Sequence, residues 1–141
     1  MHHEIERMRL KLQEGGYTCI LCINEQEYCS YERGVKPLLD FLQAGYSFEG
    51  ALAADKTVGA GAAHLYVLLG VRALWANIVS QAALQVLKEH QIEVFYGKVV
   101  PHIINRNGDG LCPIESAVMH ARTSYEAHEL IMKKLTEFAA K

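Results

Sequence analysis

The feature of this sequence that most constrains its fold is an almost wholly apolar helix between two apolar strands. Residues 57–69 place apolar side chains around the whole helix, with Gly59 and Gly61 leaving room for close backbone approach. A helix that is apolar on all sides is a buried one. Residues 48–53 before it predict a short strand, and residues 73–79 after it have the mostly apolar pattern of a strand covered on both faces. This strand–helix–strand unit predicts parallel pairing inside a layered α/β fold.

The other segments complete a single domain over residues 1–141, a common domain size. Their periodicity and their turn and capping residues predict an N-terminal helix within 1–15, strands at 17–23, 27–32 and 92–96, and helices at 35–44, 81–89, 113–120 and from Thr123 onward. The expected fold is a three-layer α/β/α sandwich with a mixed sheet of about five strands. Ligands of such sheets collect where strands run into helix amino termini. Here the sequence places Asp55-Lys56 and Ser80 at those points.

Charge and hydropathy exclude several classes of partner. The formal net charge is -2 and the pI is about 6.4, with no basic stripe, so duplex nucleic acid is not an expected partner. The longest apolar stretch, 65–71, is far shorter than the roughly 20 residues that span a bilayer. The charged N-terminus does not have the pattern of a signal peptide, so we expect no membrane partner and a cytoplasmic location.

The four cysteines are expected to be free thiols, as is usual in a reducing compartment. Cys19 and Cys22 have the C-x-x-C spacing of zinc and redox motifs. They lie in a strand-like run, however, where side chains three residues apart point to opposite faces. We therefore interpret them as small apolar strand residues.

Four stretches of the chain carry a family resemblance: RGVKPLL at 33–39, AADKTVG at 53–59, YVLLGV at 66–71, and PHIINR at 101–106 followed by CPIE at 112–115. They resemble a small prokaryotic family of unknown function that is classed as cytidine deaminase-like by fold. The resemblance covers nearly the whole chain after residue 15. It implies a fold and is silent on activity.

The same resemblance implies a zinc site whose ligands this chain lacks. Deaminases carry H-A-E or C-A-E at one helix N-terminus and P-C-x-x-C at a second, and these residues hold zinc and shuttle protons. The corresponding residues here are Ala53-Ala54-Asp55-Lys56 at the first position, and Ser80 and Ala83 at the second. Neither serine nor alanine replaces a thiolate, so we expect no zinc and no other cofactor. A formyl-transferring domain of purine biosynthesis is similar in fold and works without metal, so losing zinc need not mean losing catalysis.

Asp55, Lys56 and Cys112 are the candidate catalytic residues. A carboxylate at a helix N-terminus is stabilised by the helix dipole, and the adjacent lysine would hold an anion. The alternative is that Asp55 is only a helix cap and Lys56 is solvated. Cys112 precedes Pro113 at an expected helix start, where a thiol has a lowered pKa and can act as a nucleophile. The alternative is a small residue buried under the loop.

The candidate ligand-binding residues are Ser80, Asn105, Arg106 and Glu115. The run Asn105 to Gly110 has the start of a calcium-loop pattern, but turn chemistry explains it better because only one carboxylate lies in its first five positions. Arg106 is the better candidate for an anion contact.

These residues predict a zinc-free domain that binds a nucleotide-like or other small anionic metabolite, with weak catalysis through Cys112 as an open question. The alternative is a non-catalytic module that senses a metabolite or binds another protein. The apolar helix and the deaminase-like architecture both favour a homodimer.

Overall fold

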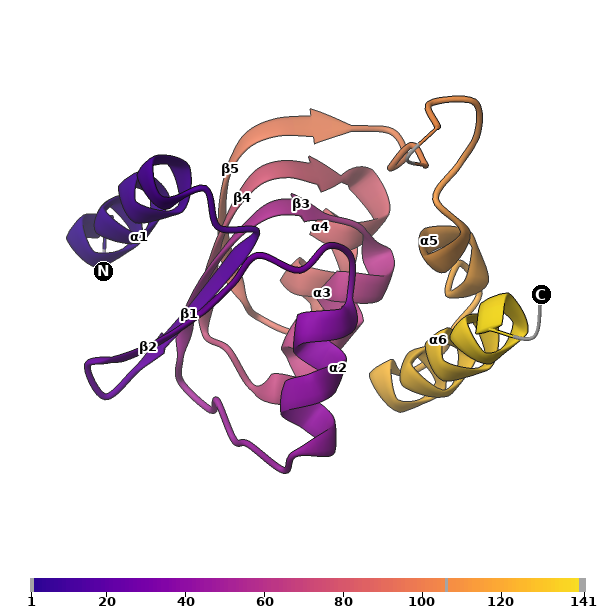
Figure 1. Cartoon of the computed structure of the whole chain (residues 1–141), viewed down its shortest axis with the longest axis horizontal. Coiled ribbons are helices and arrows are strands. Elements are labelled where there is room, and N and C mark those ends of the chain that lie inside the picture. The colour runs from indigo at the N-terminus through magenta and orange to yellow at the C-terminus, as the bar shows by residue number, and fades with distance from the viewer. Residues whose placement is uncertain (1, 106, 140–141) are drawn as a thin grey trace.

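A five-stranded mixed sheet runs through the centre of the molecule (Figure 1). The computed structural model describes residues 2–105 and 107–139. The strands are β1 (Cys19–Ile23), β2 (Gln26–Ser30), β3 (Leu52–Val58), β4 (Ala73–Ser80) and β5 (Glu93–Val100), in the spatial order β2-β1-β3-β4-β5. The helices are α1 (His2–Gly15), α2 (Lys36–Gln43), α3 (Ala60–Leu69), α4 (Gln81–Glu89), α5 (Pro113–Ala117) and α6 (Ser124–Ala139). Strands β3, β4 and β5 are parallel, and β1 is antiparallel to both of its neighbours.

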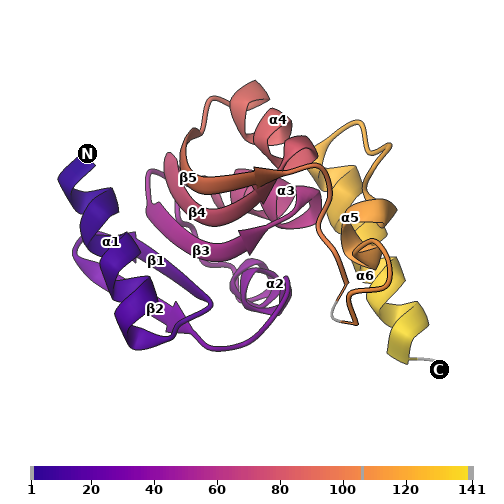
Figure 2. The ribbon, with the colours of Figure 1, turned by 90° about the horizontal axis from the view of Figure 1, so that it is seen from above.

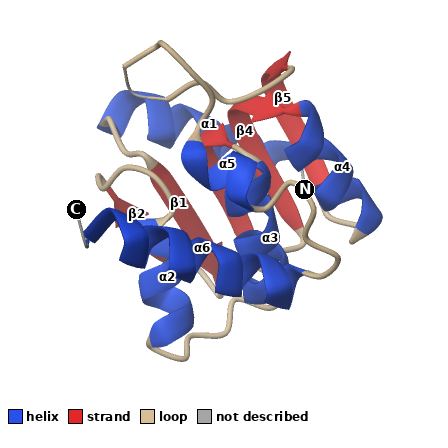
Figure 3. Ribbon diagram, turned by 90° about the vertical axis from the view of Figure 1, so that its right-hand side faces the viewer, coloured by secondary structure: helices blue, strands red, loops and turns tan. Residues whose placement is uncertain are grey.

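The helices cover the sheet unequally. Helix α1 lies alone on one face, and α2, α3 and α4 lie on the other (Figures 1 and 2). Helices α5 and α6 pack against α3 on its outer side, in front of the sheet in Figure 3. The predicted three-layer α/β sandwich with a five-stranded mixed sheet is confirmed. Within the described residues, no helix has the length and apolarity needed to cross a membrane.

Each face of the sheet has its own hydrophobic core. The smaller core joins α1 to the sheet through Ile5, Met8, Leu12, Ile20, Leu52, Ala54 and Ala73. The larger core lies between the sheet and α2–α4 and extends to α6. Cys19 belongs to the larger core while Cys22 packs against the smaller one, so the two thiols point to opposite faces, as the strand pattern predicted.

Helix α3 is the buried centre of the larger core. Ala60 to Tyr66 and Leu69 are all buried, and Gly70 ends the helix in the left-handed conformation, with φ +88°. At Gly61, an added Cβ would lie 2.6 Å from Ile114 Cγ2 of α5, so the predicted close approach occurs there. Helices α2, α4, α5 and α6 of the same chain cover α3. The apolar surface of α3 is therefore buried within one chain and does not require a homodimer.

The boundary between β3 and α3 was predicted wrongly. The sequence placed a strand at 48–53 and a helix from Thr57, whereas β3 runs to Val58 and α3 begins at Ala60. Phe48 lies before the strand, in a turn held by its N–H donating to the Leu69 carbonyl. The end of β3 pairs with Ile78 and Val79 of β4, and this pairing keeps it extended. Similarly, β5 extends four residues beyond the predicted end at Tyr96 because it continues to pair with β4.

The parallel strands curve near their carboxyl ends (Figure 1). Ala76 and Val79 of β4 are three residues apart, yet both lie in the larger core, so the alternation of faces breaks between them. At the same level of β5, a Cβ on Gly97 would lie only 2.8 Å from the Asn77 carbonyl oxygen, so β4 and β5 approach closely there. The bend carries the strand ends over the amino termini of α3 and α4.

Candidate functional site

A buried carboxylate lies where the amino termini of α3 and α4 meet. Glu115 of α5 is only 6% exposed. Its Oε2 accepts hydrogen bonds from the Ala60 N–H, at 2.8 Å, and from the Ser80 hydroxyl. Its Oε1 accepts the Ile103 N–H at 2.8 Å. Of the predicted site residues, Ser80 and Glu115 are therefore brought into contact from positions 35 apart in the chain.

Ser80 lies at the helix start where the sequence placed it, and it caps α4. Its Oγ accepts the Ala83 N–H at 3.1 Å, which satisfies one of the free donors of the first helical turn. The same hydroxyl donates to Glu115, and Ser80 is completely buried. The side chains of Ser80 and Glu115 therefore connect β4, α3 and α5 to one another and are not exposed to solvent.

Asp55 does not lie at a helix amino terminus, contrary to the prediction. It lies within β3, and the residue that caps α3 is Gly59. Asp55 Oδ2 accepts the Tyr66 hydroxyl at 2.6 Å, and Oδ1 accepts the Thr57 N–H at 3.2 Å. Burial raises the pKa of the Asp55 carboxyl to about 7, although both hydrogen bonds act in the opposite direction.

The hydrogen bond between Tyr66 and Asp55 was not predicted from the sequence. Burial, followed by the nearby Asp55 charge, raises the pKa of the Tyr66 phenol well above its ordinary value. Cys19 is paired with Asp55 across β1 and β3, and burial also raises the pKa of its thiol. Eleven residues separate Asp55 from Tyr66. No local pattern in the sequence signals the contact.

Lys56 follows Asp55 in β3, and its side chain is exposed. Its backbone N–H donates to the Thr18 carbonyl at 3.0 Å, which extends the pairing of β1 and β3. The two neighbours therefore have opposite environments, with a buried carboxyl and a solvent-facing ammonium group.

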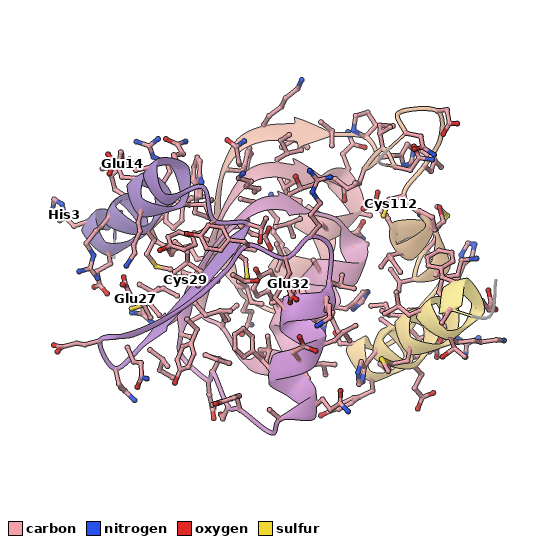
Figure 4. All side chains as sticks on the ribbon, in the orientation of Figure 1. His3, Glu14, Glu27, Cys29, Glu32 and Cys112 are labelled. Atoms are coloured by element: carbon pink, nitrogen blue, oxygen red, sulfur yellow. The ribbon has the colours of Figure 1, made fainter. Side chains whose placement is uncertain are left out.

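Cys112 is the N-cap residue of α5, as predicted, but makes no capping hydrogen bond through its side chain. Helix α5 has only five residues, so it supplies little of the dipole that the nucleophile hypothesis requires. Cys112 is half-buried, and its N–H donates to the Ile103 carbonyl at 2.8 Å. Figure 4 shows it at the start of α5, on the other side of the molecule from Cys29. The hydrogen bonds of the described residues include none from Cys112 to a histidine.

Asn105 holds a tight loop. Its side-chain amide donates to Asp109 Oδ1 at 2.9 Å, and its carbonyl Oδ1 accepts the Asp109 N–H at 3.2 Å. Ile104 and Leu111 form an antiparallel bridge that closes the loop. The interpretation of this run as turn chemistry agrees with these contacts. Arg106, the predicted anion contact, lies outside the described residues.

The residues at the two helix starts do not fit a deaminase zinc. Residues 53–56 were aligned with the first deaminase motif, which lies at a helix start. Because α3 begins at Ala60, these residues lie in β3, before the helix start. The side chains that meet at the helix starts supply one hydroxyl and one carboxylate, with no thiolate or imidazole. Among the described residues, no group of three His, Cys, Asp or Glu side chains is arranged to hold a metal ion.

Two surface depressions lie away from this junction. One, of about 510 Å³, lies beside α1 and is lined by Arg7, Leu10, Lys11, Glu14, Gly15 and Tyr17. The other, of about 380 Å³, lies near the carboxyl ends of α3 and α4 and includes Glu49 and His90. Neither is lined by a predicted site residue.

His64 is a buried, hydrogen-bonded residue of the core. His64 lies on α3 and its Nδ1 is 3.0 Å from Ser124 Oγ of α6. Burial lowers the pKa of the imidazole.

Comparisons with known proteins identify a family and a fold. The family model of TM1506, described as a domain of unknown function (DUF1893), matches residues 7–135. A DUF1893 family protein from Thermotoga maritima has a similar structure, with a TM-score of 0.81 and 23% identity over 95% of this chain and 90% of that one. At this identity the likeness shows the fold alone.

A diaminohydroxyphosphoribosylaminopyrimidine deaminase/5-amino-6-(5-phosphoribosylamino)uracil reductase from the same organism gives a TM-score of 0.47 and 12% identity, over 84% of this chain and 42% of that one. No curated protein matches the sequence. The family model spans most of the chain, and the chain therefore belongs to the DUF1893 family, a family of unknown function.

Proposed function

We propose that this domain is a zinc-free relative of the cytidine deaminase-like proteins that binds a small anionic, nucleotide-like metabolite at the carboxyl edge of its sheet. One observation carries the proposal: hydrogen-bond donors from three separate parts of the chain converge on a single carboxylate at this edge. Backbone N–H groups at a helix start, together with a hydroxyl group, are the donors that proteins use for carboxylates and phosphates.

The residue types expected around this edge support the same ligand class. Lys56 is solvent-facing at the end of β3 and would neutralise an anionic group. Cys112 and Asn105 are half-buried on the segment that leads into α5, and Arg106 follows Asn105 in the chain. Asp55, as a buried carboxyl bonded to Tyr66, would support the strand beneath the ligand without contacting it.

A thermal-denaturation screen against nucleotides, nucleosides and phosphosugars tests the proposal. A ligand that binds the native state raises the melting temperature with increasing concentration. We expect Lys56→Ala to reduce this rise, because it removes the exposed cation at the edge. Lys88→Ala is the matched control, since Lys88 is also exposed but lies in the last turn of α4, at the other end of that helix.

Cys112→Ser tests the role of the thiol in the same assay. A ligand-induced rise in melting temperature that is unchanged in both Lys56→Ala and Cys112→Ser would contradict the proposed site. A library that produces no rise in the wild-type protein would contradict binding of this ligand class.

A second candidate function is a protein-interaction module, and exposed apolar side chains favour it. Ile104 and Leu111 face each other across the loop bridge and are about half exposed, and Met119, Tyr125 and Met132 are exposed on or near α5 and α6. Large apolar side chains left exposed to solvent are the kind of residue that a partner protein covers. For this candidate we expect a homodimer by light scattering and a monomer for Ile104→Asp. A wild-type protein that is monomeric at all concentrations would contradict it.

A further inference from the structure

Two cysteines lie on the same face of the β1–β2 hairpin, and they are not the C-x-x-C pair of the sequence. Cys29 of β2 is directly opposite Ile20 of β1, and Ile20 belongs to the smaller core beneath α1. Because opposite residues of an antiparallel pair share a face, Cys29 points to the side of α1, as Cys22 does. Cys19 points to the other face. The fold therefore brings together Cys22 and Cys29.

The hairpin register places these two free thiols on a diagonal. Cys22 is directly opposite Glu27, which lies two residues before Cys29 on the same face. Diagonal neighbours of this kind have Cα atoms roughly 7–8 Å apart, with the Cβ atoms somewhat closer. A disulfide requires Cα atoms closer than about 7 Å, so this pair lies at or beyond the limit for one. An ion held between the two sulfurs spans a longer distance than a direct S–S bond.

An ion pair from α1 lies beside the two thiols. Lys11 of α1 pairs with Glu27, the residue opposite Cys22. This contact is the main reason why the pKa of Lys11 is raised, and the nearby Cys29 adds to the effect. Figure 4 shows Glu27 and Cys29 on the side of the hairpin that carries α1.

The environment of Cys22 supplies two cations. Burial and the charge of Glu27 raise the pKa of its thiol, and Glu4 acts in the same direction. Arg7 and Lys11 act in the opposite direction. A monovalent ion held by two thiolates leaves a net charge of about −1. Arg7 and Lys11 are placed to complement that charge.

The number of ligands decides which metal ion suits this pair. Thiolates select soft ions, among them Cu(I) and Zn²⁺. Zn²⁺ takes four ligands, and in the part of the chain that the structure describes no group of three His, Cys, Asp or Glu side chains could hold an ion. Cu(I) forms stable complexes with two thiolates alone, so two cysteines without a third ligand match Cu(I) better.

We propose that Cys22 and Cys29 form a two-coordinate site for Cu(I). Binding replaces two S–H bonds with two S–Cu bonds and releases two protons, and the copper remains Cu(I) throughout. The site uses none of the residues of the proposed ligand site, so it does not depend on the proposed function.

Competition with bicinchoninate, a coloured indicator of Cu(I), tests the site on the full chain, reduced and free of oxygen. We expect the wild-type protein to withdraw one Cu(I) per chain from the indicator and to release two protons per ion. Cys22→Ser and Cys29→Ser each leave a single thiolate. Each should weaken binding by more than about a hundredfold, because loss of even an outer partner of a metal ligand costs about ten- to a hundredfold.

Cys112→Ser is the matched control, because Cys112 is also a free, half-buried cysteine but lies on the other side of the molecule (Figure 4). It should bind Cu(I) as tightly as the wild type. Cys29 is exposed, so Cys29→Ser should keep the fold, and it decides the question alone if Cys22→Ser does not fold. Wild-type affinity in folded Cys29→Ser would overturn the site. So would an equal loss in Cys112→Ser, or a wild-type protein that takes no Cu(I) from the indicator.

Discussion

The buried Asp55 carboxyl makes a strong prediction about the pH dependence of stability. Its pKa is raised from 3.8 to about 7 in the folded protein, and the residue is 9% exposed. The folded state therefore keeps a proton that the unfolded chain releases near pH 4. The stability that Asp55 contributes is fully present below pH 3.8, the pKa of its carboxyl in the unfolded chain, and is lost as the pH rises toward 7. Above about pH 7 the carboxyl is ionised in both states, and its contribution no longer changes.

The magnitude follows from the two pKa values. At ~1.4 kcal/mol for each pH unit, the interval from 3.8 to about 7 corresponds to a loss of about 4 kcal/mol in the free energy of unfolding. Asp55→Asn cannot ionise, and its side-chain oxygen can still accept a hydrogen bond. We expect the stability of Asp55→Asn relative to wild type to increase progressively with pH up to about pH 7, and then to level off.

Urea denaturation between about pH 5 and pH 8 measures this difference, with the midpoint and slope fitted at each pH. Asp40→Asn is the matched control, because Asp40 is exposed and pairs with Lys36 in the same helix. Burial raises the pKa values of Cys19 and Tyr66, so neither titrates in this range. A stability difference between Asp55→Asn and wild type that does not change with pH would refute the reasoning.

Three further substitutions test other parts of the structure. Tyr66→Phe removes the hydrogen bond that lowers the Asp55 pKa, so the pH midpoint of the stability loss should move upward in the same urea titration. Ser80→Ala removes both a helix cap and a donor to a buried carboxylate, and should lower the free energy of unfolding by about 2 kcal/mol in urea at neutral pH. Gly97→Ala puts a methyl group 2.8 Å from the Asn77 carbonyl and should cost about 1–3 kcal/mol, whereas an unchanged denaturation midpoint would contradict the close approach of β4 and β5.

The local elements of this fold were predictable where one sequence signal dominated. Ser80 followed by the periodic run 81–89 was sufficient to place α4 at the observed bounds. The strands at 17–23 and 27–32 were also predicted; they form a hairpin, and its turn residues Asn24 and Glu25 both have positive φ. In each case the signal lies within a few residues of the element that it determines.

The end of β3 could not be predicted because its cause lies in another strand. Asp55, Lys56 and Thr57 look like a helix start, with an acidic residue before an apolar run. Pairing with β4 keeps these residues extended, and α3 begins only at Ala60. The structure thus separated Asp55 from the helix terminus and gave it Tyr66 as a partner instead.

The candidate site was also predictable only in part, for the same reason. Two of its residues were recognised one by one: Ser80 was placed at a helix start, and Ser80 and Glu115 were both given as candidate ligand-binding residues. Only the tertiary structure brought Glu115 to Ser80, Ala60 and Ile103, which come from different segments of the chain. Sequence alone determined the alternation of strands and helices, because periodicity and capping are local. The folded chain decided which polar groups are buried together, because that depends on distant segments meeting at the curved end of one sheet.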